Sequence, residues 1–305
     1  MLLVFGSINV DLLFQVETLP RPGETVLCPG YALAAGGKGA NQAAAAARAG
    51  AAVRMIGHVG DDGFGRFARQ AMAAAGVDCA ALVSSSRPTG IAVIGVDRRA
   101  ENQIMVASGA NLDTRAEQVA DRELTPGVTV LCQNEVRPQA SFALLERAKA
   151  RGARTILNLA PAGVVSPQVL SALDVLVVND IEGRMAAGCP NDADVAAFAR
   201  ALATGHDLTC IVTLGAAGAL AVGPDVAQRI PALPVEPLDT TGAGDAFAGV
   251  LAASLDLGHE LGTALRRASV AAGLACTRIG AQTSQPTAAQ IDARLPELAA
   301  PAPLD

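Results

Sequence analysis

The sequence lacks tryptophan and has few other aromatic residues, with one tyrosine and seven phenylalanines among 305 residues. It also has few basic residues: 23 lysines and arginines stand against 29 aspartates and glutamates, a formal charge of −6, and no basic run occurs. Nucleic acids and anionic membrane surfaces attract proteins through basic patches. The sequence therefore argues against both as the main partner.

A cysteine motif is absent too. The six cysteines are scattered and contain no C-x-x-C pair: Cys28, Cys79, Cys132, Cys189, Cys210 and Cys276. This spacing is typical of reduced thiols in a cytosolic protein, and not of a disulfide framework or a zinc site. No apolar stretch is long enough to predict a membrane span, and the apolar N-terminus lacks the basic residues of a signal peptide. We expect a cytoplasmic protein.

Strand-like and helix-like segments alternate along most of the chain. Residues 2–8 form an apolar run that is typical of a strand covered on both faces. Residues 38–50 and 63–76 have helical spacing and end in glycine. The pattern predicts an α/β fold with a central, mostly parallel sheet flanked by helices. We expect residues 1–305 to form a single domain.

Two stretches interrupt this alternation. Residues 10–35 are extended and rich in turns, and residues 90–106 have the pattern of two strands around a polar turn at Asp97–Arg99. These inserts predict either a small β-sheet lid that excludes water from a site, or an irregular extension of the main sheet.

The stretch DTTGAGDAF, residues 239–247, places a glycine turn at the start of an alanine-rich helix. The N–H groups of Gly242, Ala243 and Gly244 would be unhindered at the positive end of the helix dipole, as in an anion site. The spacing fits neither the dinucleotide fingerprint nor the P-loop. Asp245 follows, and it is either an acid favoured by the dipole in a first helical turn or a functional carboxylate.

Polar residues also lie where ligands bind in open α/β sheets. Asn9 and Asp11 are two apart at the end of the first strand, so their side chains point the same way. The glycines around Lys38 and Asn41 would leave the backbone open to a ligand near a helix start. Each of these patterns also occurs in ordinary strand ends and glycine turns.

Three further patterns are compatible with phosphate or cation binding. Asn179 and Glu182 have the spacing of a capping box, and they also suit outer-sphere contact with Mg²⁺ and a phosphate. The glycine turn at 213–218 could hold phosphate or ribose. The 239–241 and 275–284 segments could supply carbonyl and hydroxyl oxygens to a hard monovalent cation.

Together these segments resemble the ribokinase-like, or PfkB, family of carbohydrate kinases. The resemblance covers nearly the whole chain and includes both signature regions, AAGGKGANQAAAAARAG and DTTGAGDAFAGVL, in the family's order. It implies an ATP-dependent kinase that phosphorylates the primary hydroxyl of a pentose, with D-ribose giving ribose 5-phosphate as the leading reaction. A nucleoside kinase or another sugar kinase, such as a fructokinase, is the alternative. The scarcity of aromatic residues disfavours a nucleoside.

The resemblance implies roles for individual residues. Asp245 would be the catalytic base, and the amides of Gly242, Ala243 and Gly244 the anion hole. The sugar would be bound by Asn9, Asp11, Gly37, Lys38, Asn41 and Glu135, together with Asp245. The nucleotide would be bound by Asn179, Thr213, Leu214, Gly215, Ala216, Ala217, Gly218, Gly244 and Ser269. Glu182 would hold Mg²⁺ through its outer sphere. An activating K⁺ would be bound by Asp239, Thr241, Ala275, Arg278, Gly280 and Ser284.

Two segments depart from the family pattern. NLAPA, residues 158–162, has no proline directly after the asparagine, and CQNEV, residues 132–136, places Asn134 where an apolar residue is usual. Both are expected on the substrate side of the sheet, so they bear on the choice of sugar and not on the reaction. The lid strands also predict a homodimer in which two lids pair edge to edge.

Overall fold

The computed structural model describes residues 1–99, 101–190 and 192–304. Within these ranges a ten-stranded sheet has the order β14-β13-β12-β11-β10-β9-β8-β1-β4-β5. Its strands are β1 (Leu2–Phe5), β4 (Val53–Gly60), β5 (Leu82–Ser85), β8 (Thr129–Gln133), β9 (Arg154–Asn158), β10 (Val175–Asn179), β11 (Thr209–Thr213), β12 (Ala219–Gly223), β13 (Val226–Ile230) and β14 (Ala302–Pro303). The strands from β11 to β5 run parallel, and β12, β13 and β14 add antiparallel neighbours at one edge.

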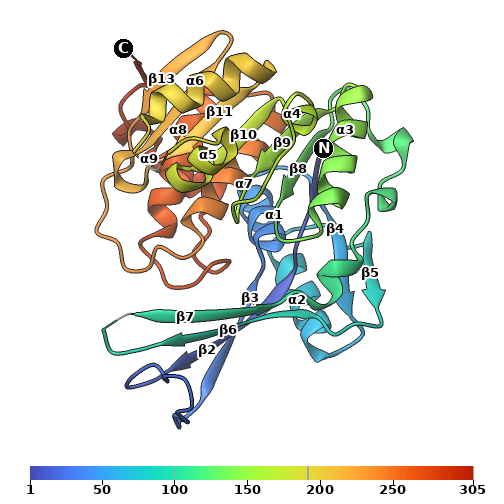
Figure 1. Cartoon of the computed structure of the whole chain (residues 1–305), viewed down its shortest axis with the longest axis vertical. Helices are drawn as coiled ribbons and strands as arrows, with labels where there is room; N and C mark the ends of the chain where they lie inside the picture. The colour runs from blue at the N-terminus through green and yellow to red at the C-terminus, as the bar shows by residue number, and fades with distance from the viewer. Residues whose placement is uncertain (100, 191, 305) are drawn as a thin grey trace.

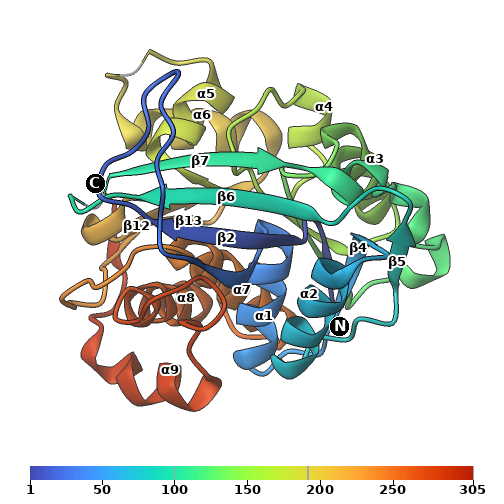
Figure 2. The same cartoon turned by 90° about the horizontal axis from the view of Figure 1, so that it is seen from below.

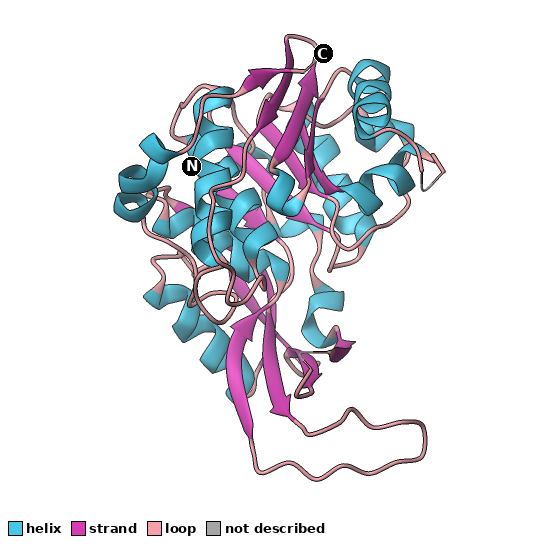
Figure 3. Cartoon of the chain, turned by 90° about the vertical axis from the view of Figure 1, so that its left-hand side faces the viewer, coloured by secondary structure: helices cyan, strands magenta, loops and turns pink. Residues whose placement is uncertain are grey.

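Helices cover both faces of this sheet (Figure 3). The reason lies in the strand sequences: in β1, Leu2 and Val4 face one hydrophobic cluster, while Leu3 and Phe5 face the other. The first cluster packs under α1 (Lys38–Arg48), α2 (Gly63–Ala74), α7 (Ala243–Asp256), α8 (Leu261–Ala275) and α9 (Ala288–Arg294). The second packs under α3 (Pro138–Ala150), α4 (Pro167–Leu170), α5 (Asp180–Ala187) and α6 (Val195–His206). The predicted α/β fold is confirmed.

A second, four-stranded sheet projects from the body of the molecule (Figure 1). Its order is β3-β2-β6-β7, with β2 (Asn9–Gln15), β3 (Tyr31–Gly36), β6 (Gly90–Val96) and β7 (Asn102–Ala107). Seen from below, it lies across the ends of α1 and α7 (Figure 2). The prediction of a separate small sheet is therefore confirmed, and the alternative of an extension to the main sheet is wrong. Below, this sheet is called the lid.

The structure contains elements that the sequence pattern did not reveal. The strands of the first insert form only at its two ends, and residues 16–30 connect them without a strand. Three short 3-10 helices follow the lid, at Gly109–Asp113, Ala116–Gln118 and Asp121–Glu123. Among the described residues, no helix combines the length and apolar character needed to span a membrane.

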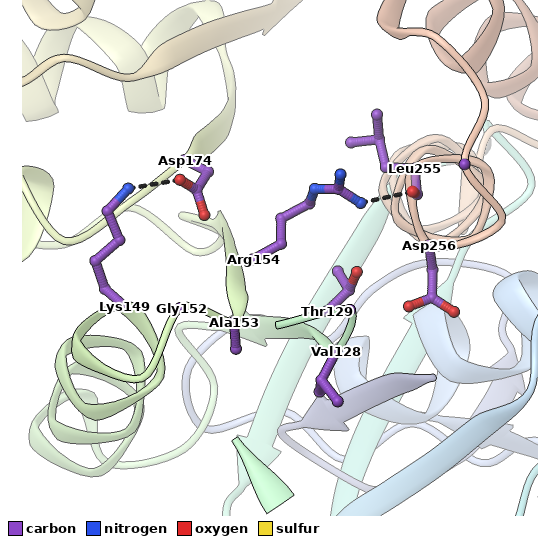
Figure 4. Close-up of a pocket in the computed structure, with 11 residues that line it drawn as sticks. Val128, Thr129, Lys149, Gly152, Ala153, Arg154, Asp174, Leu255 and Asp256 are labelled. Carbon is purple, nitrogen blue, oxygen red and sulfur yellow. Dashed lines mark hydrogen bonds and ion pairs between the residues drawn. The ribbon is translucent and has the colours of Figure 1, made fainter. Parts of the chain in front are cut away.

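Helix α7 runs between the C-terminal ends and the N-terminal ends of the parallel strands. Its C-terminal end borders a hollow of about 500 Å³ among the N-terminal ends of the strands (Figure 4). There the Arg154 guanidinium donates to the Leu255 carbonyl at 2.5 Å, and Lys149 pairs with Asp174 at 2.5 Å. None of the predicted site residues lines this hollow. The predicted site residues lie toward the opposite ends of the strands, where α7 begins.

Candidate active site

The start of α7 presents free backbone amides. Gly242 is the N-cap with a φ of 76°, and a Cβ there would lie 2.9 Å from the Cα of Ala281, so glycine is required for both reasons. The Ala243 N–H donates to the Thr240 carbonyl at 3.2 Å. In the described part of the chain, the N–H groups of Gly244 and Asp245 have no acceptor. These two groups are free to bind an anion at the positive end of the helix, whereas the Ala243 N–H of the predicted anion hole is already bonded.

Asp245 lies beside these amides and is buried, with 7% of its surface exposed. Its Oδ2 accepts a hydrogen bond from Asn41 Nδ2, and its Oδ1 accepts one from Gln42 Nε2, both at 2.9 Å. Burial raises the pKa of Asp245, although the Lys38 ammonium and the two amides oppose the rise. The carboxylate is thereby a stronger proton acceptor than an aspartate in water.

Lys38 and Glu135 lie next to this carboxylate. The backbone N–H of Lys38 donates to Glu135 Oε2 at 3.0 Å, and the Ser7 hydroxyl donates to the same oxygen at 2.7 Å. Burial by itself would lower the pKa of the Lys38 ammonium, but the charges of Asp245, Glu135 and Glu182 more than offset it, and the pKa is raised. Lys38 is therefore a half-buried, permanent positive charge among carboxylates.

Asp11 adds a further carboxylate from the first lid strand. Burial, with the charges of Glu135 and Asp245, raises the pKa of Asp11 to about 6. Its carboxyl group lies against the lid strand β3, where a Cβ at Gly36 would come within 2.3 Å of Oδ1. A ligand that donates hydrogen bonds, such as a polyol, is the natural partner for this group of acceptors.

Asn9 is oriented by a residue that the sequence analysis missed. Asn111 Nδ2 donates to Asn9 Oδ1 at 2.8 Å, while Asn111 Oδ1 accepts from the Ile8 N–H at 2.9 Å. The bond occupies the oxygen of the Asn9 amide and leaves its NH₂ group for a ligand. Asn111 follows the lid strand β7, in a segment for which the sequence analysis made no prediction.

We expect Asn111→Leu to raise the KM for the sugar about tenfold, because the Asn9 amide loses the bond that orients it. The turnover number should change less, since Asn111 contacts none of the groups around Asp245. Steady-state kinetics with varied sugar measures both values. Gln118→Leu, in the neighbouring 3-10 helix, is the control; an unchanged KM in Asn111→Leu would contradict the assignment.

A cavity of about 460 Å³ lies on the other side of the α7 start. The predicted nucleotide residues that line it are Thr213, Gly215, Ala216, Gly218, Gly244 and Ser269. Leu214 and Ala217 lie in the same turn but do not line it. The sequence analysis missed the rest of the lining, which is Ala232, Leu233, Pro234, Val235, Pro237, Thr240, Phe247, Ala272, Gly273 and Cys276, with Ala243 shared with the anion hole. The apolar, proline-rich run at 231–237 is the sequence feature that could have indicated this part of the lining.

Asn179 and Glu182 do form a capping box at the start of α5. Asn179 Oδ1 accepts from the Glu182 N–H at 2.8 Å, and Glu182 Oε2 accepts from the Asn179 N–H at 2.9 Å. Asn179 pairs in register with Thr213, but it does not line the cavity. Burial raises the pKa of Glu182, against the effect of its bond to Asn179 and of the Lys38 charge. The Lys38 charge acts on Glu182, so Glu182 lies on the same side of the molecule as Lys38, and its outer-sphere contact with Mg²⁺ stays a prediction.

The predicted monovalent-cation residues converge behind the anion hole. Asp239 Oδ1 accepts from the Thr241 N–H and its Oδ2 from the Gly280 N–H, both at 2.9 Å. Burial alone would raise the pKa of Asp239, but these bonds lower it below its usual value. Ala275 ends α8, and the Arg278 N–H donates to its carbonyl at 3.2 Å. An ionised carboxylate at the negative end of a helix fits a hard monovalent cation.

Ser284 lies in the same segment, with its hydroxyl bonded to the Ala281 carbonyl at 3.2 Å. The nearby Ser269 hydroxyl donates to Pro231 O at 2.6 Å, which holds the proline-rich wall of the cavity. The two segments that depart from the family pattern meet as well: Asn134 Nδ2 donates to Pro161 O at 2.9 Å. Their expected place on the substrate side of the sheet stays a prediction.

Comparisons with known proteins agree with this geometry. A family model described as pfkB family carbohydrate kinase matches residues 1–288. A ribokinase of Haemophilus influenzae is 35% identical over 292 residues, covering 94% of this chain and 95% of that protein. A deoxyribokinase of Salmonella typhi is 32% identical over 295 residues, covering 95% and 96%. The structure of an Arabidopsis thaliana ribokinase complexed with ribose and ATP has a TM-score of 0.88 at 29% identity, covering 96% and 98%.

Proposed function

The chain belongs to the pfkB family of carbohydrate kinases, and on that premise we propose that it transfers the γ-phosphoryl group of ATP to the primary hydroxyl of D-ribose. One observation carries the proposal. The Asp245 carboxylate and the free amides at the start of α7 lie between a cluster of hydrogen-bond acceptors suited to sugar hydroxyls and a cavity large enough for a nucleotide. A phosphoryl donor in the cavity and an alcohol acceptor at the cluster would meet at the start of α7.

Different residues contribute to different parts of phosphoryl transfer. Asp11, Glu135 and the Asn9 amide bind the hydroxyls of the sugar, and Asp245 accepts the proton of the attacking hydroxyl. The Gly244 and Asp245 amides stabilise the negative charge on the transferring group, because they are fixed in place before the reaction. Glu182 would hold Mg²⁺ through its outer sphere, and the ion would supply positive charge to the phosphate oxygens.

The test is ATP consumption with D-ribose, 2-deoxyribose, fructose and adenosine. We expect the highest kcat/KM with ribose. A preference for 2-deoxyribose or fructose would change the sugar but keep the reaction, because relatives named for deoxyribose and fructose share this fold. Turnover of none of the four would overturn the proposal.

We propose that K⁺ activates the enzyme by stabilising the loop that carries the anion hole. The support is the convergence of Asp239, the carbonyl end of α8 and Gly280 directly behind Gly242. We expect a lower turnover number in Tris-only buffer than after addition of KCl, with little change on addition of NaCl. In Asp239→Asn the response to KCl should be weakened. Equal rates in all three buffers would contradict this prediction.

We further propose a homodimer that forms through the lid. The edge strands β3 and β7 expose large apolar side chains, with Tyr31 60%, Ile104 54% and Met105 70% exposed. Pairing two lids would cover both the open edges and these side chains. We expect light scattering at micromolar concentration to give a dimer, and Met105→Glu to give a monomer. Leu257→Lys, on the far side of the molecule, is the control; a monomeric wild-type protein would refute the proposal.

We propose that the whole chain acts as one cytoplasmic catalytic unit, since site residues come from the lid, the first helix and α7 alike. All six cysteines are free, which suits a reducing compartment. Limited proteolysis that yields a separately active fragment would contradict the single unit.

A further inference from the structure

Gln42 lies directly behind the proposed base and is fully buried. Its Nε2 donates to Asp245 Oδ1 at 2.9 Å and to Asn158 Oδ1 at 2.8 Å. Its Oε1 accepts from Gln133 Nε2 at 2.8 Å. These four side chains come from α1, β8, β9 and α7, so the network joins the main sheet to the helix that carries the base.

The network has one consistent orientation. Because Gln133 donates to the oxygen of Gln42, the NH₂ group of Gln42 must face Asp245 and Asn158. Asn158 is fixed in turn, since its own NH₂ group donates to the Val177 carbonyl at 3.1 Å. Reversing the Gln42 amide would set its oxygen against two other oxygens. The side chains therefore hold one another in a single arrangement.

The arrangement leaves one atom in a destabilising position, and side-chain packing alone does not explain why polar residues occur here. Among the described residues, Gln133 Oε1 is buried without a hydrogen-bond partner, and a buried, unpaired carbonyl oxygen destabilises a protein. An apolar residue at Gln133 would avoid that cost, but it would leave Gln42 Oε1 without its donor. The charged group to which this amide network bonds is Asp245.

We propose that Gln42 is a positioning residue for Asp245, and that Gln133 and Asn158 set the orientation of Gln42. The inference rests on the proposed function. By holding Oδ1, Gln42 fixes the rotation of the carboxylate and directs Oδ2, which Asn41 shares, toward the sugar hydroxyl. Gln42 cannot contact the substrate itself, because none of its surface is exposed. Because Gln42 bonds to the charged form of Asp245, it also keeps the pKa of Asp245 lower than burial alone would make it.

The test uses Gln42→Met, which keeps the volume and the unbranched shape but removes the amide. We expect the turnover number to fall about 10- to 100-fold, the KM for ATP to stay constant, and the acid limb of the kcat–pH profile to move to higher pH. Gln133→Met should give a smaller fall, and adding it to Gln42→Met should have little further effect. Gln70→Met, an exposed residue on α2, is the control.

A second measurement does not depend on any sugar. In protein labelled with ¹³C at the aspartate carboxyls, the Asp245 signal, assigned by its loss in Asp245→Asn, should titrate at higher pH in Gln42→Met than in the wild type. If no sugar is turned over but this shift occurs, the proposed function fails and the positioning role stands. A native titration and a native turnover number in Gln42→Met overturn the inference. If Gln42→Met does not fold, the same comparison in Gln133→Met decides it.

Discussion

Replacing Asp245 by asparagine should lower turnover by about 10²–10⁴-fold, the typical loss when a general base is removed. A free aspartate, with a pKa near 3.9, is too weak a base to deprotonate an alcohol before the attack. Burial raises the pKa of Asp245, so its proton affinity comes closer to what transfer late in the reaction requires. Asparagine has nearly the same shape but cannot accept the proton.

The nucleotide cavity borders the Gly244 amide and not the Asp245 carboxylate, so ATP binding should stay near the wild-type value. Single-turnover kinetics and nucleotide titration separate the two effects. Asp256→Asn, the same exchange at the other end of α7, should keep full turnover. A turnover number within a few-fold of wild type in Asp245→Asn would remove this residue from the mechanism.

Asp11→Asn should lower the kcat/KM for the sugar and at the same time raise the unfolding free energy of the protein. The loss of a charged acceptor should reduce kcat/KM for the sugar by about 100-fold, because hydrogen bonds to charged groups contribute roughly 1.5–3 kcal/mol each. The sugar-free protein should gain up to about 3 kcal/mol in unfolding free energy at neutral pH. That estimate follows from the rise of the Asp11 pKa from 3.8 to about 6 on folding.

The sign of this effect can be checked against pH. Between about pH 4 and 6 the folded protein binds more protons at Asp11 than the unfolded chain does, so the wild-type stability falls as pH rises through that window. The difference between Asp11→Asn and wild type should therefore be largest above pH 6 and disappear near pH 4. In the wild type, the KM for the sugar should rise as pH falls below 6, because Asp11 takes up a proton.

Denaturant unfolding at several pH values, without sugar, measures the stability difference, and steady-state kinetics measures the KM. Asp61→Asn, an exposed acid on the first turn after β4, should change neither quantity. A destabilised Asp11→Asn protein, or a pH-independent difference, would show that the Asp11 charge is not an energetic cost of the site.

The sequence predicted those features that depend on local pattern. Apolar runs such as residues 2–8 and glycine-ended helices such as α1 gave the α/β fold, because period and turn residues determine both. The roles of Asp245, Lys38 and Glu135 come from the family resemblance and stay predictions. The structure brings these three side chains near one another.

The features that were missed depend on contacts between distant segments. Gln42 and Asn158 are 116 residues apart, and no local pattern indicates that their amides meet. Asn111 lies 102 residues from Asn9. The proline-rich wall of the nucleotide cavity was also missed, because an apolar loop has no helical or strand period. The sequence analysis assigned Leu214 and Ala217 by motif, although their turn presents only its other members to the cavity.

Helix α7 is buried from Asp245 to Leu255, and its far end is held by Arg154. The base therefore belongs to a helix that is buried along most of its length, whereas Asn9 and Asp11 stand on a projecting sheet with exposed edges. A library that varies only lid residues should thus alter which sugar is accepted without removing the phosphoryl-transfer chemistry. Directed evolution of a new kinase from this chain can begin in the lid and leave the core unchanged.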